Sequence, residues 1–398
     1  MYDDEVVIIG AGICGLATAL ALHKKGIKSV VTEKSETLRN DTGATITIRP
    51  NGWRALDQLG VANILRHTAI PLHRERVVSL DEGRQQEISL YNCVGETRCL
   101  RRKDLIDTLY AALPPATVKF GCQLESIKLD PHTTKPVLRF IDGSSIVTKV
   151  IIGCDGCKSI VAKFLNLKPT KMFPLCEVRG LTNYQYGHSF AHDFTSFRKD
   201  SILVGRIPID NNWVYWFCTQ PYIAKDERTW KEPEVIRQHT LELLRNYPQE
   251  IQEMIKAADT KSLSFKHLRY RAPWDLLTGT FSRGTMIVAG DAMHVMGPFL
   301  GQGGSAALED AVVLARNMAQ LAGLNQSGSK LTIHRVVEAF NQFVRQRRMR
   351  VVRLSLQTYL IGMISGTSLR LKKFICILLV ILLFRNPKSH MDYDCGDL

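Results

Sequence analysis

The sequence predicts an α/β protein with an α+β insertion. Three short apolar runs, at residues 6–9, 150–152 and 286–289, each end in a turn rich in glycine or aspartate. This arrangement is typical of parallel strands in a nucleotide-binding sheet. Residues 175–220 instead alternate aromatic and other side chains, which indicates a second, separate β-sheet.

Residues 5–33 predict a strand, a glycine turn, a helix and a second strand. In the turn, Gly10 permits the tight bend, Gly12 lets the backbone approach a pyrophosphate, and Gly15 lets the helix pack closely on the strand. Glu33 ends the second strand, where an acid accepts hydrogen bonds from the ribose of adenosine. This unit predicts a dinucleotide site without separating NAD from FAD.

The two later turns favour FAD over NAD. Asp291 ends a predicted strand, where it can accept a hydrogen bond from a ribityl hydroxyl or order water beside the pyrophosphate. Residues 298–304 then lead into a helix predicted over 303–320. Glycines at that helix start let backbone N–H groups face a flavin ring, and the helix dipole favours negative charge there. The three turns together predict FAD, because so long a dinucleotide must be held at both ends.

The other elements are predicted from local pattern. Helices are expected from Asn51 to about 59 and over residues 101–113, 233–257 and 334–356, and a small antiparallel meander over 120–150. We predict a discontinuous FAD-binding domain over residues 1–172 and 271–345, a substrate-binding domain of β-sheet and helix over 173–270, and a C-terminal helical tail over 346–398.

Composition limits the classes of partner. The net charge is +14, but much of the excess is local to residues 345–353 and 370–373, and no nucleic-acid-binding signature accompanies it. We therefore predict no nucleic-acid partner. The ten cysteines are scattered, and the single CxxC at 154–157 lacks a second cysteine or histidine pair, so no metal site is predicted.

The two ends of the chain bear on location. The first predicted strand begins about four residues after Met1, which leaves no room for a signal or transit peptide and predicts a cytoplasmic protein. Residues 374–384 are eleven apolar residues between basic flanks. As a helix they reach about 16 Å, roughly half the hydrocarbon thickness of a bilayer, so they are too short to span it. We favour burial of this helix, while a peripheral membrane contact through residues 372–385 stays open.

Three motifs carry a family resemblance: GAGICG at 10–15, CDGCKS at 154–159 and GDAMHVMGPFLGQGGSAALEDA at 290–311. The chain resembles the group A FAD-dependent aromatic hydroxylases of the para-hydroxybenzoate and salicylate hydroxylase type, most closely their plant monooxygenase-1-like branch. RxxL at 102–105, RAPW at 271–274 and the terminal residues 393–398 agree with this resemblance. One departure is Ser305, where many relatives have asparagine or cysteine.

The resemblance implies a Rossmann-like FAD-binding domain of the para-hydroxybenzoate hydroxylase type. It also implies an NAD(P)H-dependent monooxygenase, in which NAD(P)H reduces the flavin and O2 adds to form a flavin C4a-hydroperoxide. That species would then hydroxylate a small aromatic substrate. Two other readings stay open: an epoxidase or flavin reductase acting on a lipid-like substrate, and a non-catalytic flavin protein that senses a ligand.

The resemblance also assigns residues. Asp155 and Gly156 would contact FAD and the path of NAD(P)H, Arg102 would contact FAD, and Arg39 would lie in a basic loop near it. The full predicted FAD set is Gly10, Gly12, Ile13, Cys14, Gly15, Glu33, Lys34, Arg39, Arg102, Leu124, Asp155, Gly156, Asp291, Pro298, Gly301, Gln302, Gly303 and Gly304.

No catalytic side chain is assigned, because the family chemistry is supplied mainly by the cofactor. His294 and Arg49 are predicted as contacts to an anionic substrate. Tyr215 belongs to the aromatic block that would roof the substrate pocket, with Trp213 and Phe217 on its side of the strand and Val214 and Trp216 on the other.

Overall fold

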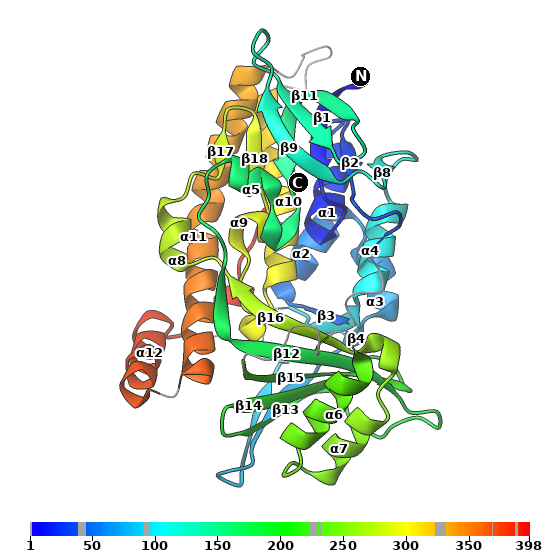
Figure 1. The fold of residues 1–398 in the computed structure, drawn as a ribbon, viewed down its shortest axis with the longest axis vertical. Helices are drawn as coiled ribbons and strands as arrows, with labels where there is room; N and C mark the ends of the chain where they lie inside the picture. Colours follow the sequence, from blue (N-terminus) through cyan, green and yellow to red (C-terminus); the bar gives the residue numbers. More distant parts are fainter. Residues whose placement is uncertain are drawn as a thin grey trace.

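The computed structural model describes residues 2–38, 45–90, 95–222, 230, 232–322, 332–367, 369–386 and 389–398. It contains an eight-stranded sheet, a seven-stranded sheet and a three-stranded sheet. Figure 1 shows the eight-stranded sheet in the upper half of the molecule and the seven-stranded sheet in the lower half. The arrangement is mixed α/β, as the sequence predicts.

The eight-stranded sheet has a parallel centre in the order β18-β11-β1-β2-β8. These strands are β1 (Tyr2–Ile9), β2 (Val30–Thr32), β8 (Val118–Lys119), β11 (Ser145–Gly153) and β18 (Met286–Val288), and β17 (Ser282–Arg283) pairs antiparallel at the edge. Val6, Val7 and Ile8 are almost fully buried, as expected for a strand covered on both faces. The predicted meander is confirmed, since β9 (Leu124–Leu129), β10 (Pro136–Phe140) and β11 pair antiparallel.

Helices pack around this sheet. The apolar helix α1 (Ile13–Lys24) packs on α10 (Gly303–Ala322), which also contacts α2 (Pro50–Leu59) and α11 (Ile333–Gly366). The remaining helices of this half are α3 (Ala62–Thr68), α4 (Arg102–Ala111), α5 (Ile160–Phe164), α8 (Pro273–Thr278) and α9 (Asp291–His294). The helices predicted from residue 51 and over 101–113, 303–320 and 334–356 are confirmed, and α11 continues about ten residues further than predicted.

The seven-stranded sheet has the order β16-β12-β15-β14-β13-β5-β6. Its strands are β5 (Arg74–Ser79), β6 (Arg84–Ser89), β12 (Lys171–Asn183), β13 (Asp193–Lys199), β14 (Ile202–Pro208), β15 (Trp213–Pro221) and β16 (Ser264–Tyr270). Strands β5 and β6 fall inside the range predicted for the FAD-binding domain, yet they extend this second sheet. The predicted helix over 233–257 forms two helices, α6 (Pro233–Leu243) and α7 (Gln249–Lys256), separated near Pro248.

The two faces of the second sheet differ, as the alternation along β15 predicts. Val214, Trp216 and Cys218 pack in the core that α6 and α7 cover. Trp213, Tyr215 and Phe217 lie in another apolar cluster that includes Cys99. Cys99 belongs to β7 (Arg98–Arg101), which pairs with β3 (Thr45–Ile48) and β4 (Ile70–Pro71) in the three-stranded sheet. Strand β3 of this sheet contacts α2, α4 and α10, so the aromatic face of the second sheet points toward the half of the molecule that holds the glycine turns.

The apolar tail forms helix α12 (Arg370–Leu383), which lies beside the lower end of α11 (Figure 1). Cys376 is the buried residue of this helix, and most of its other side chains are exposed. The expectation that this helix is buried is therefore wrong for most of its surface. Among the described residues, no helix is both long enough and apolar enough to cross a membrane.

Candidate functional site

The three glycine turns meet around one side chain, that of Cys14. Its Sγ lies 3.6 Å from Sγ of Cys154, at the end of β11. A methyl group at Gly290, after β18, would come within 2.8 Å of the Cys14 Cβ. Parallel strands β1, β11 and β18 lie side by side, so the turns at their carboxyl ends share one edge of the sheet. That edge is where open α/β sheets bind ligands.

The first turn has the shape of a phosphate cradle. A methyl group at Gly15 would lie only 1.9 Å from the carbonyl oxygen of Gly10, so the close packing of α1 on β1 requires glycine there. A methyl group at Gly12 would meet no protein atom within 4 Å. The space beside the N-terminus of α1 is therefore open, at the end of the helix where N–H donors and the dipole attract phosphate.

Glu33 is held at the mouth of this turn. Its carboxylate accepts hydrogen bonds from the backbone N–H of Ala11 at 2.9 Å and of Ser35 at 3.0 Å. The side chain is buried, while Lys34 beside it is exposed. These bonds fix an acid beside the turn, where it was predicted to receive the ribose of adenosine.

Asp155 follows β11, and one of its carboxylate oxygens has no hydrogen-bond partner among the described residues. Its Oδ2 accepts a hydrogen bond from Ile160 N–H at 2.7 Å, whereas the buried Oδ1 has no hydrogen-bond partner among the described residues. Burial raises the pKa of Asp155. A buried polar atom without a partner is uncommon, and a hydroxyl or phosphate-bound water of a cofactor would satisfy it. A methyl group at the neighbouring Gly156 would meet no protein atom within 4 Å, so the space there is also open.

Asp291 begins α9, directly after the third turn, and its side chain is accessible to solvent. Desolvation by the surrounding protein raises its pKa. The charges of His294 and Arg102 oppose this rise in pKa. Arg102, at the start of α4, therefore lies within electrostatic range of Asp291.

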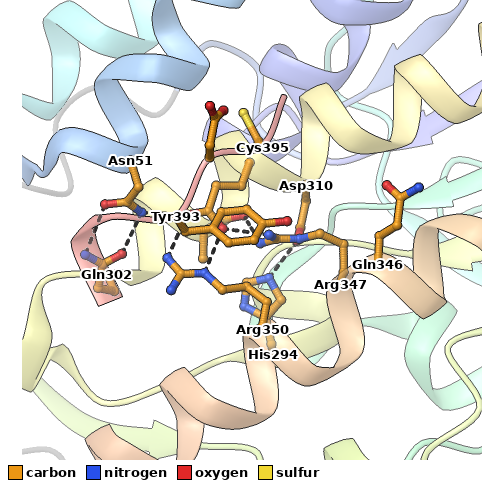
Figure 2. Close-up of polar contacts among 12 residues, drawn as sticks. Asn51, His294, Gln302, Asp310, Gln346, Arg347, Arg350, Tyr393 and Cys395 are labelled. Carbon is orange, nitrogen blue, oxygen red and sulfur yellow. Dashed lines mark hydrogen bonds and ion pairs between the residues drawn. The ribbon is translucent and has the colours of Figure 1, made fainter. Parts of the chain in front are cut away.

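The loop at residues 298–304 is anchored by a pair of amides (Figure 2). Asn51 Nδ2 donates to Gln302 Oε1 at 2.8 Å, and Gln302 Nε2 donates back to Asn51 Oδ1 at 3.3 Å. Asn51 Nδ2 also donates to Glu309 Oε1 at 2.6 Å. Gln302 is fully buried, so its side chain anchors the loop from inside the protein instead of pointing toward a ligand. A methyl group at Gly303 would meet no atom within 4 Å, which leaves the start of α10 open.

Glu309 and Asp310 continue the buried network. Glu309 pairs with Arg347 at 2.6 Å and with Arg350 at 2.9 Å, and Asp310 pairs with Arg347 at 2.6 Å. Burial alone would raise the pKa of Asp310, but the charges of His294 and Arg347 outweigh it, and the pKa falls to about 2. Asp310 also accepts a hydrogen bond from Gly290 N–H at 2.8 Å, which ties the network to the third turn.

His294 belongs to this network. Its Nε2 lies 2.6 Å from Asp310 Oδ2, and the side chain is fully buried (Figure 2). A side chain in that place supports the turn at Gly290 and does not reach a substrate. This position replaces the prediction that His294 contacts an anionic substrate.

The sequence did not predict this buried network. Asn51, Glu309, Asp310, Arg347 and Arg350 were not predicted to have a role. A signal was present: two adjacent acids interrupt the apolar helix at 306–315, and buried charges require partners. The basic run at 345–350 supplies those partners, Arg347 and Arg350.

The C-terminal residues close the network on its outer side. The guanidinium groups of Arg347 and Arg350 lie 5.2 and 4.5 Å from the ring centre of Tyr393. Arg54 donates to the carbonyl of Tyr393 at 2.8 Å, and Arg316 donates to the carbonyl of Cys395. The C-terminal residues therefore pack against α2, α10 and α11, next to the buried network.

Arg49 joins the loop at residues 298–304, called the flavin loop below, to the second sheet. Its Nη2 lies 2.6 Å from Glu75 Oε1 on β5. Its Nε is buried without a hydrogen-bond partner among the described residues, and a methyl group at Gly301 would lie 3.9 Å from it. Arg49 therefore stands between the two halves of the molecule with one donor still available.

Aromatic and charged side chains face this region from the second sheet. Tyr215 and Phe217 have ring centres 6.2 Å apart, and Phe194 stacks on Phe217 at 6.1 Å. Arg179 pairs with Glu177 on the same face, opposite Phe217 and Thr219 in register. The pKa of Lys266 is lowered by burial first, and then by the charges of Arg179 and Arg102. This face therefore combines a stack of rings with a cluster of cations close to Arg102.

A polar hollow of about 530 Å³ opens at the end of the same sheet. Arg101, Asn183, Asp210 and Trp213 are among its lining residues, and Arg101 pairs with Asp210 at 2.6 Å. Its polar lining differs from the apolar face around Tyr215, and Trp213 borders both.

The other predicted residues fall in several places. Leu124 is buried in the main core and Ile13 begins α1 half-buried, while Pro298 is exposed at the start of the flavin loop. Arg39 lies outside the described residues. Among the described residues, no group of three histidine, cysteine or acidic side chains is placed to hold a metal ion.

The chain matches the family described as "FAD binding domain" over residues 3–333. It is 44% identical over 401 residues to Monooxygenase 1 of Arabidopsis thaliana, covering 100% of both chains. It is 34% identical over 409 residues to Monooxygenase 2 of the same plant, covering 100% of this chain and 98% of that one. The solved structure of Klebsiella pneumoniae HpxO, complexed with FAD and uric acid, aligns with a TM-score of 0.81 and 23% identity, covering 98% of this chain and 96% of that one.

The fold and the three-turn cradle are those of FAD-binding flavoproteins of the para-hydroxybenzoate hydroxylase type. The open helix starts at Gly12 and Gly303 and the unpartnered oxygen of Asp155 fit such a cofactor. The chain belongs to the FAD-dependent monooxygenase family, in the monooxygenase-1-like branch that the motifs predicted. The protein is an oxidoreductase that binds FAD.

Proposed function

We propose that the protein uses NAD(P)H and O2 to hydroxylate a small aromatic substrate. One observation carries this proposal: the ring face of Phe194, Tyr215 and Phe217 points toward the half of the molecule that holds the cofactor turns. A planar aromatic compound fits against such a face, because ring stacking is favourable and needs no charged partner.

When bound, FAD supplies the redox chemistry, by accepting electrons from NAD(P)H and activating O2. The N-terminus of α1 beside Gly12 would hold the pyrophosphate, and Glu33 the ribose of adenosine. Asp155 and Asp291 would accept hydrogen bonds from hydroxyl groups of the cofactor. The N-terminus of α10 at Gly303 would face the flavin ring and stabilise negative charge on it.

The second sheet would orient the substrate and exclude water. Tyr215 is buried among Leu72, Ile207 and Cys99, so its ring forms part of a dry wall. The free Nε of Arg49 would donate a hydrogen bond to a polar substituent of the substrate, since it lies beside Gly301 of the flavin loop. No side chain here is assigned a proton-transfer role.

The test is a screen of the purified, FAD-loaded protein against small aromatic compounds. NADH and NADPH are supplied separately, the rate of flavin bleaching is followed without O2, and products are then collected under ¹⁸O2. We expect one class of aromatic compound to accelerate bleaching and to return with one labelled oxygen. Peroxide without a labelled product would instead support a flavin reductase, and a labelled epoxide of a lipid-like compound would support an epoxidase. Absence of bleaching with every compound would support a ligand sensor.

A further inference from the structure

Helix α12 exposes an unusual amount of apolar surface. Ten large apolar side chains between residues 369 and 383 are each between 37% and 73% exposed. Phe374 and Ile381 are among the most exposed, at 63% and 62%. A surface helix normally exposes its polar face to solvent. A continuous exposed apolar patch instead marks an interaction surface.

One stripe of α12 is fastened to the protein. Cys376, Val380 and Phe384 recur every four residues and pack in a cluster with Leu360 and Met363 of α11. The guanidinium of Arg353 on α11 lies 5.8 Å from the ring centre of Phe384. The stripe that packs on α11 is narrow. Contact with α11 sets the position of α12, and the rest of the helix surface is exposed to solvent.

The charges within and directly beside α12 in the sequence have one sign. Arg370, Lys372, Lys373 and Arg385 flank it, and no aspartate or glutamate occurs from residue 369 to residue 386. The whole chain carries a net charge of +14. Long basic side chains can keep their charged ends at a polar boundary while their stems lie along an apolar one.

We propose that α12 docks the protein on the surface of an anionic lipid bilayer, with the helix lying in the plane of the interface. Exposed leucine, isoleucine and phenylalanine would enter the acyl boundary, and the basic flanks would pair with anionic headgroups. The helix has 14 residues, about 21 Å, which is shorter than the hydrocarbon core of about 30 Å. The charges also disfavour a second copy of this chain as the occupant, because two such helices would bring like charges together.

The neighbouring surface suits the same partner. Trp274 on α8 is 48% exposed, and its ring meets Tyr359 of α11 edge-on at 5.4 Å. Tyr359 packs against the cluster that holds α12. The ring of Trp274 also lies 5.1 Å from the ammonium group of Lys171. Tryptophan beside a cation is typical of residues at the level of lipid headgroups, so this pair would widen the docking face.

The experiment uses the full-length, FAD-loaded protein and vesicles of phosphatidylcholine with or without phosphatidylserine. Cosedimentation measures the fraction bound. We expect binding at least about tenfold stronger when phosphatidylserine is present, because each basic residue near an anionic surface contributes about 1 kcal/mol. Raising the salt concentration is expected to weaken that binding.

Variants separate the apolar and charged contributions. Phe374→Ser with Ile381→Ser is expected to weaken vesicle binding about tenfold or more, while Ile64→Ser with Ile141→Ser, at comparably exposed positions elsewhere, leaves it unchanged. Lys372→Glu with Lys373→Glu is expected to remove the preference for anionic lipid. Lys128→Glu with Arg139→Glu makes the same charge change on exposed residues of β9 and β10. FAD content confirms that each variant is folded.

Three outcomes would overturn the proposal. Vesicle binding that does not exceed the control without lipid is one, and binding that the α12 variants leave unchanged is another. The third is a dimer that Phe374→Ser with Ile381→Ser dissociates, with no vesicle binding, because it would assign the apolar face to a second copy of the chain. None of these measurements depends on turnover, so they stand apart from the test of the hydroxylation reaction.

Discussion

The sulfur atoms of Cys14 and Cys154 lie 3.6 Å apart, although 140 residues separate them in the chain. Cys14 also lies close to Gly290 of the third turn. One small side chain therefore holds together the turns that follow β1, β11 and β18. Their common edge leaves open space at Gly12 and Gly303, and FAD binding requires that space.

Gly12→Ala tests the space at the first turn. The new methyl group meets no protein atom within 4 Å, so we expect the apoprotein to keep its melting temperature. The same methyl group would occupy the place of the pyrophosphate. Overpacking of this kind costs about 1–3 kcal/mol, so FAD affinity is expected to fall about tenfold to a hundredfold. Fluorescence titration of the apoprotein with FAD measures the change.

Gly15→Ala is the matched contrast. Its methyl group would lie 1.9 Å from the carbonyl oxygen of Gly10, so we expect loss of the folded state itself. If Gly12→Ala also lowers the melting temperature of the apoprotein by several degrees, the space at Gly12 is not reserved for a ligand. Unchanged FAD affinity in Gly12→Ala would contradict the placement of the pyrophosphate.

The local elements could be predicted from the sequence because their signals are local. The strand that ends at Ile9, the glycine turn and the helix after it are neighbours in the chain, and apolar spacing identifies them. The aromatic alternation along β15 similarly predicted its two faces. The family motifs predicted which turns form the cradle.

The long-range relationships could not be predicted in the same way. Asn51 and Gln302 are 251 residues apart, and nothing in either neighbourhood names the partner. His294 was predicted to contact the substrate, because the sequence does not show that its ring pairs with Asp310. The apolar run at 374–384 suggested burial, since composition alone does not show that α11 covers only a narrow stripe.

The amide pair of Asn51 and Gln302 is expected to act as a unit. Asn51→Ala and Gln302→Ala should each lower the stability and the FAD affinity, because each leaves a buried amide or carboxylate without its partner. The double variant should cost less than the sum, with a coupling of about 0.5–3 kcal/mol. Denaturant unfolding of the single and double variants measures it, and strictly additive costs would show that the pair does not anchor the loop.

Asp310 is expected to make stability depend on pH. Its pKa of about 2 in the folded protein lies below the value of about 3.9 in an unfolded chain, so the unfolded state binds the proton first. The stabilisation is therefore complete at neutral pH and is lost as the pH falls from about 5 toward 2. Asp310→Asn should cost about 3–5 kcal/mol at pH 7, because Arg347 then lacks one of its buried partners.

The matched control is Glu242→Gln on the exposed side of α6, which should leave the unfolding free energy almost unchanged. Denaturant unfolding of both variants is measured at pH 7 and at about pH 3. The cost of Asp310→Asn should shrink at the lower pH. An equal cost at both pH values would contradict the ionised, paired carboxylate described above.

Arg49 is expected to act in substrate binding. Arg49→Met should raise the KM for the aromatic substrate about tenfold, since a hydrogen bond from a charged donor contributes about 1.5–3 kcal/mol. FAD affinity and kcat should change little. Glu75→Gln, which removes the ion-pair partner alone, and Arg198→Met, at an exposed position of the same sheet, are the controls. A KM that rises equally in Glu75→Gln would show that the ion pair, and not a contact to substrate, is what matters.

Turns from distant parts of the chain are expected to hold one FAD jointly. Titration of the apoprotein with FAD measures this, with bound flavin followed by its absorbance. We expect saturation at one FAD per chain, and weaker binding in both Gly12→Ala and Gly303→Ala, whose methyl groups meet no protein atom within 4 Å. A folded protein that stays colourless and takes up no FAD would contradict the joint binding of FAD by these turns.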